Sequence, residues 1–405
     1  MTLSSTNELD LIVKPASPEQ VVATWRRTHV VWGKKLTLEK YLEREQVLSH
    51  AAFTGPNLTV YVLVPRSQPD TLDMLAHCDV FKRPCLVYSV PATNAPSEKL
   101  DNGSSTESEA LPSGTPSNRP TQGDAYSIAS VFCPHKYRGR GYASLMMKLV
   151  YQHLQSQPNA LVSTLYSDVG PKFYARQGWD TYRAFHYEIK VPSSPASTEE
   201  IGDRVEWLTS NNVDELVQQD CRQLSDKVQA LALGTNPVTS PSPGGRYLLI
   251  LPNNATMEWH WLRAQFVGPA LGYTQPERFG CKITAPTGTL SVPSFILWIH
   301  DFVTKELHVL RTHWNHEHDQ KLLLTAAVEE ARQCGLGKVI VWKVDHPSLF
   351  VSEGPRIIPE ELPVEWKVKE VERIDSLPAV AWFASEEHQS EGPLTWLCND
   401  RYGWV

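Results

Sequence analysis

The chain has 405 residues, a formal net charge of −7 and a hydrophobic content of 41%. At roughly 150 residues per domain, this length predicts two or three domains with well-formed cores. The slight acidity argues against a nucleic-acid-binding protein, which would usually present a basic surface. No apolar stretch approaches the ~18 residues of a membrane helix, and the N-terminus shows no signal peptide. We therefore expect a cytoplasmic protein without membrane contact.

Strands and helices are expected to alternate in the first half. The expected strands cover residues 9–17, 58–66, 74–90, 125–133, 160–167 and 181–191. The expected helices begin at Ser17, at Thr37, near Tyr142 and after Ser167 or Asp168 as N-cap, the last of them ending at Gly178. Such strand–helix–strand units predict an α/β domain over residues 1–192, built on a mixed sheet.

Two segments interrupt this pattern. Residues 94–124 are rich in Ser, Pro, Gly and Thr and nearly free of bulky apolar residues. They cannot bury enough surface to offset their ordering entropy, so we expect a disordered insertion that tolerates deletion. Residues 193–203 are interpreted as the linker to a second α/β domain over residues 204–405. Its expected order is two strands (246–252 and 294–303), a helix ended by Gly335, and a strand (338–344).

Seven widely spaced cysteines without a C-x-x-C motif predict reduced thiols rather than disulfides or a zinc ribbon. The segment "HWNHEHD" holds His313, His316 and His318, but no cysteine or fourth histidine stands nearby. We interpret it as a solvated loop, and no metal is expected.

The segment 138–143 reads Arg-Gly-Arg-Gly-Tyr-Ala and precedes an apolar helical pattern. It lacks the Walker sequence and the third glycine of a dinucleotide fingerprint. It fits [QR]-x-x-G-x-[GA], in which glycines allow close backbone approach and the helix N-terminus attracts an anion. A pyrophosphate is the fitting ligand, although solvent-facing arginines in a turn are a common alternative.

"SVFCPHKYRGRGYA" followed by "LYSDVGPKFYARQGW" resembles the GNAT superfamily of acyl-CoA-dependent N-acyltransferases. The resemblance covers about residues 9–191 and implies a GNAT fold. The strand–helix–strand order of residues 204–405 echoes that of the first domain, so we expect a degenerate second GNAT-like copy of the fold there. The resemblance implies acetyl-CoA as cosubstrate and Tyr174 as the acid that protonates the departing thiolate. It also implies that backbone groups of Val131, Phe132 and Cys133 pair with the pantetheine arm, and that the pyrophosphate lies on Arg138, Gly139, Arg140, Gly141, Tyr142 and Ala143.

An amine must lose a proton before it attacks the thioester, because its reference pKa is about 10.4. Asp79 and Asp124 are the candidate bases on strands, with ordinary surface carboxylates as the alternative. In a related two-copy acyltransferase family the terminal carboxylate is the base, which makes Val405 a third candidate. Cys133 is interpreted as a strand residue, because no His or Asp arrangement around it indicates a nucleophile.

The second half carries many aromatic residues, among them Trp259 and His260 beside Arg263 in "MEWHWLRAQF". Such residues form a small-molecule pocket or simply pack two domains together. Together with "LWIHDF…LHVLR" and "NDRYGW", this segment makes the whole chain resemble the fungal lysine N-acetyltransferases. That resemblance implies free L-lysine as substrate, in lysine degradation, and Arg263 or Arg311 as partner of its α-carboxylate. Acetylation of protein lysines or other small amines, and non-catalytic acyl-CoA binding, remain alternatives; the oligomeric state is not predicted.

Overall fold

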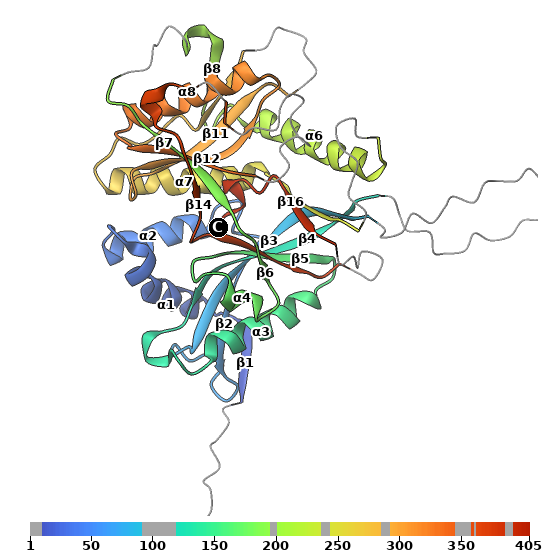
Figure 1. The fold of residues 1–405 in the computed structure, drawn as a ribbon. Coiled ribbons are helices and arrows are strands. Elements are labelled where there is room, and N and C mark those ends of the chain that lie inside the picture. The colour runs from blue at the N-terminus through green and yellow to red at the C-terminus, as the bar shows by residue number, and fades with distance from the viewer. Residues whose placement is uncertain are drawn as a thin grey trace, which may run out of the picture.

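The protein forms two mixed β-sheets, one in each half of the molecule, with helices on their faces and between them (Figure 1). The computed structural model describes residues 10–90, 119–194, 201–235, 244–284, 292–344, 358–359, 362–384 and 392–405. The α/β class expected from the sequence is confirmed. No helix in these ranges is both long and apolar enough to cross a membrane.

The first sheet has nine strands among the described residues, in the order β1-β2-β3-β4-β5-β15-β6, with β9 beside β3 and β16 beside β9. The strands are β1 (Leu11–Pro15), β2 (Leu58–Pro65), β3 (Ala76–Ser89), β4 (Thr121–Phe132), β5 (Ala160–Ser167), β6 (Asp180–Thr181), β9 (Arg246–Ile250), β15 (Leu377–Trp382) and β16 (Leu394–Leu397). The pairs β4–β5 and β9–β16 are parallel and the others are antiparallel.

The second sheet has seven strands in the order β14-β7-β13-β12-β11-β10-β8. They are β7 (Phe185–Lys190), β8 (Val205–Leu208), β10 (Gly280–Ile283), β11 (Phe295–Asp301), β12 (Glu306–His313), β13 (Lys338–Trp342) and β14 (Lys369–Glu372). Only β12 and β13 run parallel among these pairs.

The two halves exchange strands, which the sequence pattern did not predict. Residues 181–191 are not one strand closing the first domain, because β7 pairs with β13 and β14 of the second sheet. In return β15 inserts between β5 and β6, and β9 extends the first sheet beside β3. Strand pairing joins residues far apart in sequence, so a local pattern cannot reveal it. The linker expected at 193–203 lies partly outside the described residues, and strands from both sides of it contribute to both sheets.

The helices cover both sheets and line the space between them (Figure 1). They are α1 (Pro18–Thr28), α2 (Leu38–Ser49), α3 (Tyr142–Gln155), α4 (Lys172–Ala175), α6 (Asp214–Ala232), α7 (Asn254–Ala270) and α8 (Glu317–Gln333). α3 buries its predicted apolar face, including Met146 and Leu154, in the core of the first sheet. α8 forms the equivalent core on the second sheet, and α7 contacts both α2 and β11.

Three local expectations need correction. α4 is preceded by Pro171 without a side-chain cap; Ser167 instead donates its hydroxyl proton to the carbonyl of Gly170. The 19-residue helix α6 was not expected at all. β4 begins at Thr121, inside the expected insertion, because its first residues pair with the far end of β3. Residues 94–118 of that insertion lie outside the described residues.

Candidate active site

A bulge interrupts β4 near its carboxyl end. The register against β3 shifts after His77, so that two residues of β4 face Cys78. Ser130, at the bulge, has a positive φ of 52°. The register between β4 and β5 extends only to Ile128, and beyond it the two strands diverge from their pairing. A bulge bends a strand and ends its pairing. The backbone of residues 131–133 therefore has no β5 partner in the described register.

The glycine loop, residues 138–143, follows this bulge and opens α3. Gly139 and Gly141 have φ values of 77° and 81°, which a side chain would strain. α3 starts at Tyr142 with no side-chain cap, so the first amide protons of the helix are free to bind an anion. The Nε of Arg138 donates to the carbonyl of Cys133 at 3.1 Å. Residues 138–141 of the loop are exposed, and Tyr142 and Ala143 are half-buried.

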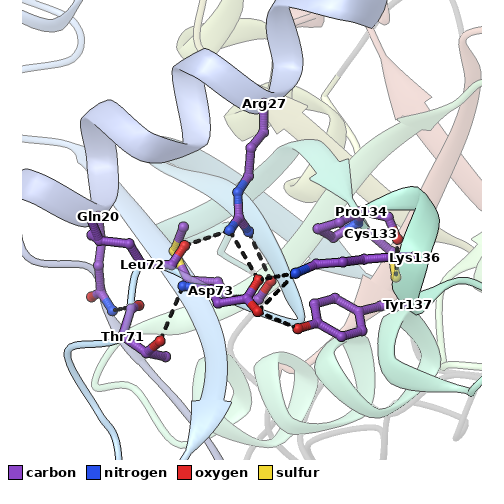
Figure 2. A network of polar contacts seen from close by, with 10 residues as sticks. Gln20, Arg27, Thr71, Leu72, Asp73, Cys133, Pro134, Lys136 and Tyr137 are labelled. Carbon is purple, nitrogen blue, oxygen red and sulfur yellow. Dashed lines mark hydrogen bonds and ion pairs between the residues drawn. The ribbon is translucent and has the colours of Figure 1, made fainter.

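Asp73 anchors the turn that leads into the glycine loop (Figure 2). Its carboxylate accepts hydrogen bonds from the Tyr137 hydroxyl at 2.6 Å and from the Lys136 Nζ at 2.8 Å. Arg27 on α1 lies 3.5 Å from the same carboxylate and also donates to the carbonyl of Met74 at 2.8 Å. The hydrogen bonds from Lys136 and Tyr137 lower the pKa of Asp73. Asp73 therefore ties the loop to α1 and to the β2–β3 connection.

Tyr174 lies on α4, buried in the core that α3 forms with the first sheet. Its hydroxyl makes no hydrogen bond to another described residue. Burial, followed by the nearby Cys78 and Asp168, raises its pKa well above the ordinary value. The side chain therefore stays protonated at neutral pH, as a proton donor requires.

Asp79 lines a cavity of about 140 Å³ on the other side of β3. Burial raises the pKa of its carboxyl, the nearby Ser130 hydroxyl opposes this shift, and the charge of Glu45 adds to it, so that the pKa is about 7. A carboxylate with this pKa is half protonated near neutral pH and can exchange a proton with an amine. The bulge in β4 thus also places Ser130 close enough to Asp79 to affect its pKa.

The same cavity brings together Val405, Trp259 and Arg263, which the sequence analysis singled out separately. The C-terminal segment reaches it by lying between the two halves (Figure 1). Arg83 holds this segment through a hydrogen bond to the carbonyl of Gly403 at 2.8 Å. His260 donates from Nε2 to the carbonyl of Tyr402 at 3.3 Å.

A larger cavity of about 630 Å³ adjoins the first and lies between the sheets. Arg263, Trp404 and Asp168 line both cavities. His260 lines the larger one, and burial lowers its pKa well below the ordinary value, so its ring is neutral. The expected pocket of aromatic and polar groups is therefore present, although some of these aromatic residues also pack the halves together.

Two expected site residues lie elsewhere. Asp124 is near the start of β4, paired with Ala160, at the opposite end of the strand from the bulge. Arg311 is 4% exposed and bonds Asp220 through two nitrogens at 2.9 Å each. Asp400 approaches the same guanidinium at 3.4 Å. Arg311 therefore lines neither cavity and serves to join α6, β12 and the C-terminal segment.

The histidine tract is only partly the solvated loop that we expected. His313 ends β12 and is buried, and burial lowers its pKa to about 4. Among the described residues, His300, Glu330 and Cys334 are close enough together to hold an ion. The 3.0 Å hydrogen bond between His300 and Glu330 already explains their approach. Cys133, at the end of β4, has a pKa raised by burial, which agrees with a strand residue rather than a nucleophile.

Comparison with known proteins identifies the family. The model described as LYC1 GNAT-like C-terminal domain matches residues 188–405, more than half of the chain. The chain belongs to this family. It is a GNAT-type N-acetyltransferase, related to a lysine acetyltransferase of Yarrowia lipolytica. The two are 24% identical over 424 residues, which cover 94% of this chain and 98% of the relative.

The acetyltransferase also resembles solved structures of low sequence identity. A probable N-acyltransferase from Enterococcus faecalis superimposes with a TM-score of 0.52 at 10% identity, covering 93% of this chain and 74% of the other. A GCN5-related N-acetyltransferase from Anabaena variabilis gives 0.49 at 12% identity, with 92% and 73% covered. The Enterococcus faecalis structure shows that the overall fold is shared along nearly the whole of this chain.

Several residues that the structure brings to the site were not predicted from the sequence. Asp73 follows no recognised motif and meets the glycine loop only through the fold. Asp168 was considered only as a helix cap, yet it lines both cavities. Arg373 and Arg401 line the larger cavity from segments that reach it through strand exchange and the C-terminal turn. The aromatic density of "NDRYGWV" was the one available signal.

Proposed function

We propose that this acetyltransferase transfers the acetyl group of acetyl-CoA to the side-chain amine of free L-lysine. The observation that carries the proposal is Asp79, a carboxyl with a pKa raised to about 7 in a cavity behind the β4 bulge. The name of the Yarrowia lipolytica relative supports lysine as the acceptor.

Acetyl-CoA fits the free edge of β4 and the glycine loop. The pantetheine arm would pair with the backbone of residues 131–133, which β5 leaves unpaired. The pyrophosphate would lie on the first amides of α3 and between the exposed Arg138 and Arg140. The cosubstrate supplies an activated acetyl group, and the chain's own residues orient it and move protons.

Two neighbouring residues of β3 support the proposal that the acid and the base act from opposite faces of the first sheet. Cys78 and Asp79 point to opposite faces, because side chains alternate along a strand. Cys78 packs with Tyr174 on the α3 face, whereas Asp79 lines the cavity on the other. A thioester in the opening between β4 and β5 would have Tyr174 toward one face and Asp79 toward the other.

The proposed proton transfers follow from these positions. Asp79 takes a proton from the substrate ammonium, and the free amine attacks the thioester carbonyl carbon. A tetrahedral oxyanion forms and collapses, and the carbon–sulfur bond breaks. The attacking nitrogen loses its second proton to solvent as the intermediate collapses, and the departing thiolate takes the phenolic proton of Tyr174. Tyr174 is then reprotonated from solvent, and Asp79 releases its proton to solvent. The α-carboxylate of Val405, in the same cavity as Asp79, is the alternative base.

Thiol release from acetyl-CoA tests the function against a panel of free amino acids, polyamines and lysine-containing peptides. We expect release with L-lysine and identification of the N6-acetylated product by mass spectrometry. No release with L-lysine would refute the proposal, and release with peptides alone would assign protein lysines instead. Blocking Val405 with a C-terminal tag should preserve kcat if Asp79 is the base. A cytoplasmic location remains a prediction.

A further inference from the structure

Three arginines converge on two tryptophans in the larger cavity. The Arg373 guanidinium carbon lies 3.7 Å from the centroid of the Trp342 ring, and that of Arg401 lies 5.0 Å from the same centroid. Arg401 is also 4.2 Å from the Trp404 ring, and Arg263 is 5.2 Å from it. All five residues line this cavity. Stacking orients a guanidinium and leaves its N–H groups, which lie in its plane, for a ligand.

Arg373 is buried without the hydrogen bonds that a buried guanidinium requires. It is 6% exposed, and its Nε and Nη1 have no hydrogen-bond partner among the described residues. Buried charged groups are normally paired, because an unpaired one keeps the full cost of lost hydration. Burial accordingly lowers the pKa of Arg373 to about 10.

The positive charges of this cluster are not neutralised by direct ion pairs. Within the described ranges, neither Arg263, Arg373 nor Arg401 forms an ion pair with a carboxylate. Burial lowers the pKa of Arg401, the charge of Asp301 opposes this shift, and the charges of Arg263 and Arg373 add to it, so that the pKa is about 10. Asp168, Glu188, Asp301, Glu306 and Asp375 also line this cavity, but none of them forms an ion pair with these three guanidinium groups among the described residues. The guanidinium N–H groups therefore remain available to an anion.

Asp301 is not the anion that pairs with these three arginines. Its Oδ1 accepts hydrogen bonds from the backbone amides of Val303 at 2.9 Å and Thr304 at 3.1 Å. Asp301 lies beyond ion-pair distance from Arg401, and its charge acts on that arginine only by raising its pKa. The free guanidinium nitrogens therefore point to an anion that the protein binds rather than contains.

We propose that Arg373 and Arg401, assisted by Arg263, form a carboxylate subsite that binds the α-carboxylate of the amine substrate. A carboxylate can accept two parallel hydrogen bonds from one guanidinium, which distinguishes this geometry from a point charge. The subsite makes the preferred substrate class a free amino acid, and it favours such substrates over polyamines and over lysines within a peptide. This inference rests on the proposed function only for the acetylation of the side-chain amine; binding of the α-carboxylate does not depend on it.

The two cavities adjoin closely enough for one substrate molecule to place its carboxylate in the larger cavity and its side-chain amine in the smaller one. Arg263 and Trp404 line the larger cavity and also the smaller one that contains Asp79. A substrate whose carboxylate lies at the arginine cluster can therefore extend its side-chain amine past Trp404 toward Asp79. The exposed glycine loop, which is expected to bind the pyrophosphate, does not line this cavity, so the cluster is not needed for that group.

Binding without acetyl-CoA tests the subsite separately from catalysis. We would titrate the full chain with L-lysine and with L-lysinamide, which lacks only the carboxylate charge. Wild type should bind L-lysine about 10-fold or more tightly than the amide, the factor expected when a charged hydrogen bond is lost. R373Q and R401Q should abolish this preference, and R373K should restore it in part. R66Q is the matched control, since Arg66 is an exposed arginine paired with Asp10.

Steady-state kinetics give the second arm. R373Q should raise KM for L-lysine and 6-aminohexanoate about 10-fold, while KM for cadaverine and acetyl-CoA changes less than about twofold. Equal increases in KM for all four compounds would overturn the subsite. Binding of L-lysinamide as tight as that of L-lysine in wild type would overturn it as well. A site that binds inorganic phosphate as tightly as L-lysine would overturn it too.

The two proposals can fail independently. If L-lysine is not acetylated but another free amino acid binds more tightly than its amide, the proposed substrate fails and the carboxylate subsite stands. If L-lysine is acetylated as fast as cadaverine by both wild type and R373Q, the subsite fails and the acetyltransferase proposal stands. If R373Q does not fold, R401Q and R373K carry the same comparisons.

Discussion

The hydroxyl of Tyr137 donates a 2.6 Å hydrogen bond to the carboxylate of Asp73, which lies 64 positions earlier in the chain. This contact, with that of Lys136, ties the entrance of the glycine loop to the β2–β3 connection and to α1. The loop backbone is therefore held in place before any ligand binds.

Asp73→Asn is expected to weaken cofactor binding and to spare the amine site. Loss of the two hydrogen bonds to a charged acceptor should raise KM for acetyl-CoA roughly fivefold, which corresponds to about 1 kcal/mol. KM for the amine should not change. Initial-rate kinetics with each substrate varied in turn measure both constants. Asp70→Asn is the matched control, because Asp70 lies on an adjacent turn and pairs with Lys14 of β1 rather than with the glycine loop. A similar effect of both variants would contradict the anchoring role.

Asp79→Asn is expected to lower kcat by a factor of about 10² to 10⁴, the usual contribution of a general base. In wild type, kcat/KM should rise with pH as the Asp79 carboxyl, with its pKa of about 7, loses its proton. A pH–rate profile from pH 5 to 9 shows this limb. If kcat of the variant stayed within threefold of wild type, the base would lie elsewhere, with Val405 next to be tested.

Asp79→Asn should also change how the stability of the folded chain depends on pH. The folded pKa of Asp79 lies above its unfolded value, so the folded chain holds the extra proton more tightly. Its contribution to stability is complete below about pH 4 and is lost as pH rises through 7. Asp79→Asn removes this loss, and the variant should gain stability relative to wild type at pH 8 but not at pH 4. Urea unfolding at the two pH values measures the difference; a loss of stability at pH 8 would contradict the raised pKa.

Tyr174→Phe is expected to reduce kcat by about 10² or more, because the thiolate would leave without a proton donor. Thermal stability should change little, since the hydroxyl has no hydrogen-bond partner among the described residues. Thiol-release rates and thermal melts of the same preparation measure both effects. Tyr126→Phe is the control, because Tyr126 is a partly buried tyrosine packed against the same core. Full activity of Tyr174→Phe would remove this residue from the mechanism.

Gly141→Ala tests the backbone of the glycine loop. Its φ of 81° disfavours a side chain although the space around it is open, and the left-handed conformation costs about 1 kcal/mol or more for alanine. We expect this loss of stability together with a higher KM for acetyl-CoA. Gly272→Ala is the matched control, with a φ of 84° and open space in a turn after α7. It should show the same loss of stability and an unchanged KM; a raised KM in both variants would indicate a general effect.

The features that sequence predicted well are local ones. The glycine loop, the apolar face of α3 and the position of Tyr174 each depend on residues close together in the chain. The amphipathic pattern of α3 was readable because one face meets one sheet. Asp79 was identifiable as a strand carboxylate, but its raised pKa depends on burial that only the assembled cavity provides.

The features that sequence missed depend on long-range pairing. Arg373 follows β14 and reaches the cavity because β14 pairs with β7 in the second sheet. Arg311 looked like a carboxylate ligand for substrate, but Asp220 and Asp400 already occupy its guanidinium. Neither outcome has a local signal, since both depend on which distant strands and helices become neighbours.

The strand exchange makes this protein a candidate for a split enzyme. A chain divided between residues 194 and 201 would leave the glycine loop, Asp79 and Tyr174 on one fragment and the arginine cluster on the other. The first fragment lacks the partners of β7, and the second lacks the sheet that receives β9 and β15. Neither piece has a complete sheet by itself, so acetyl transfer by co-expressed fragments would report their reassembly.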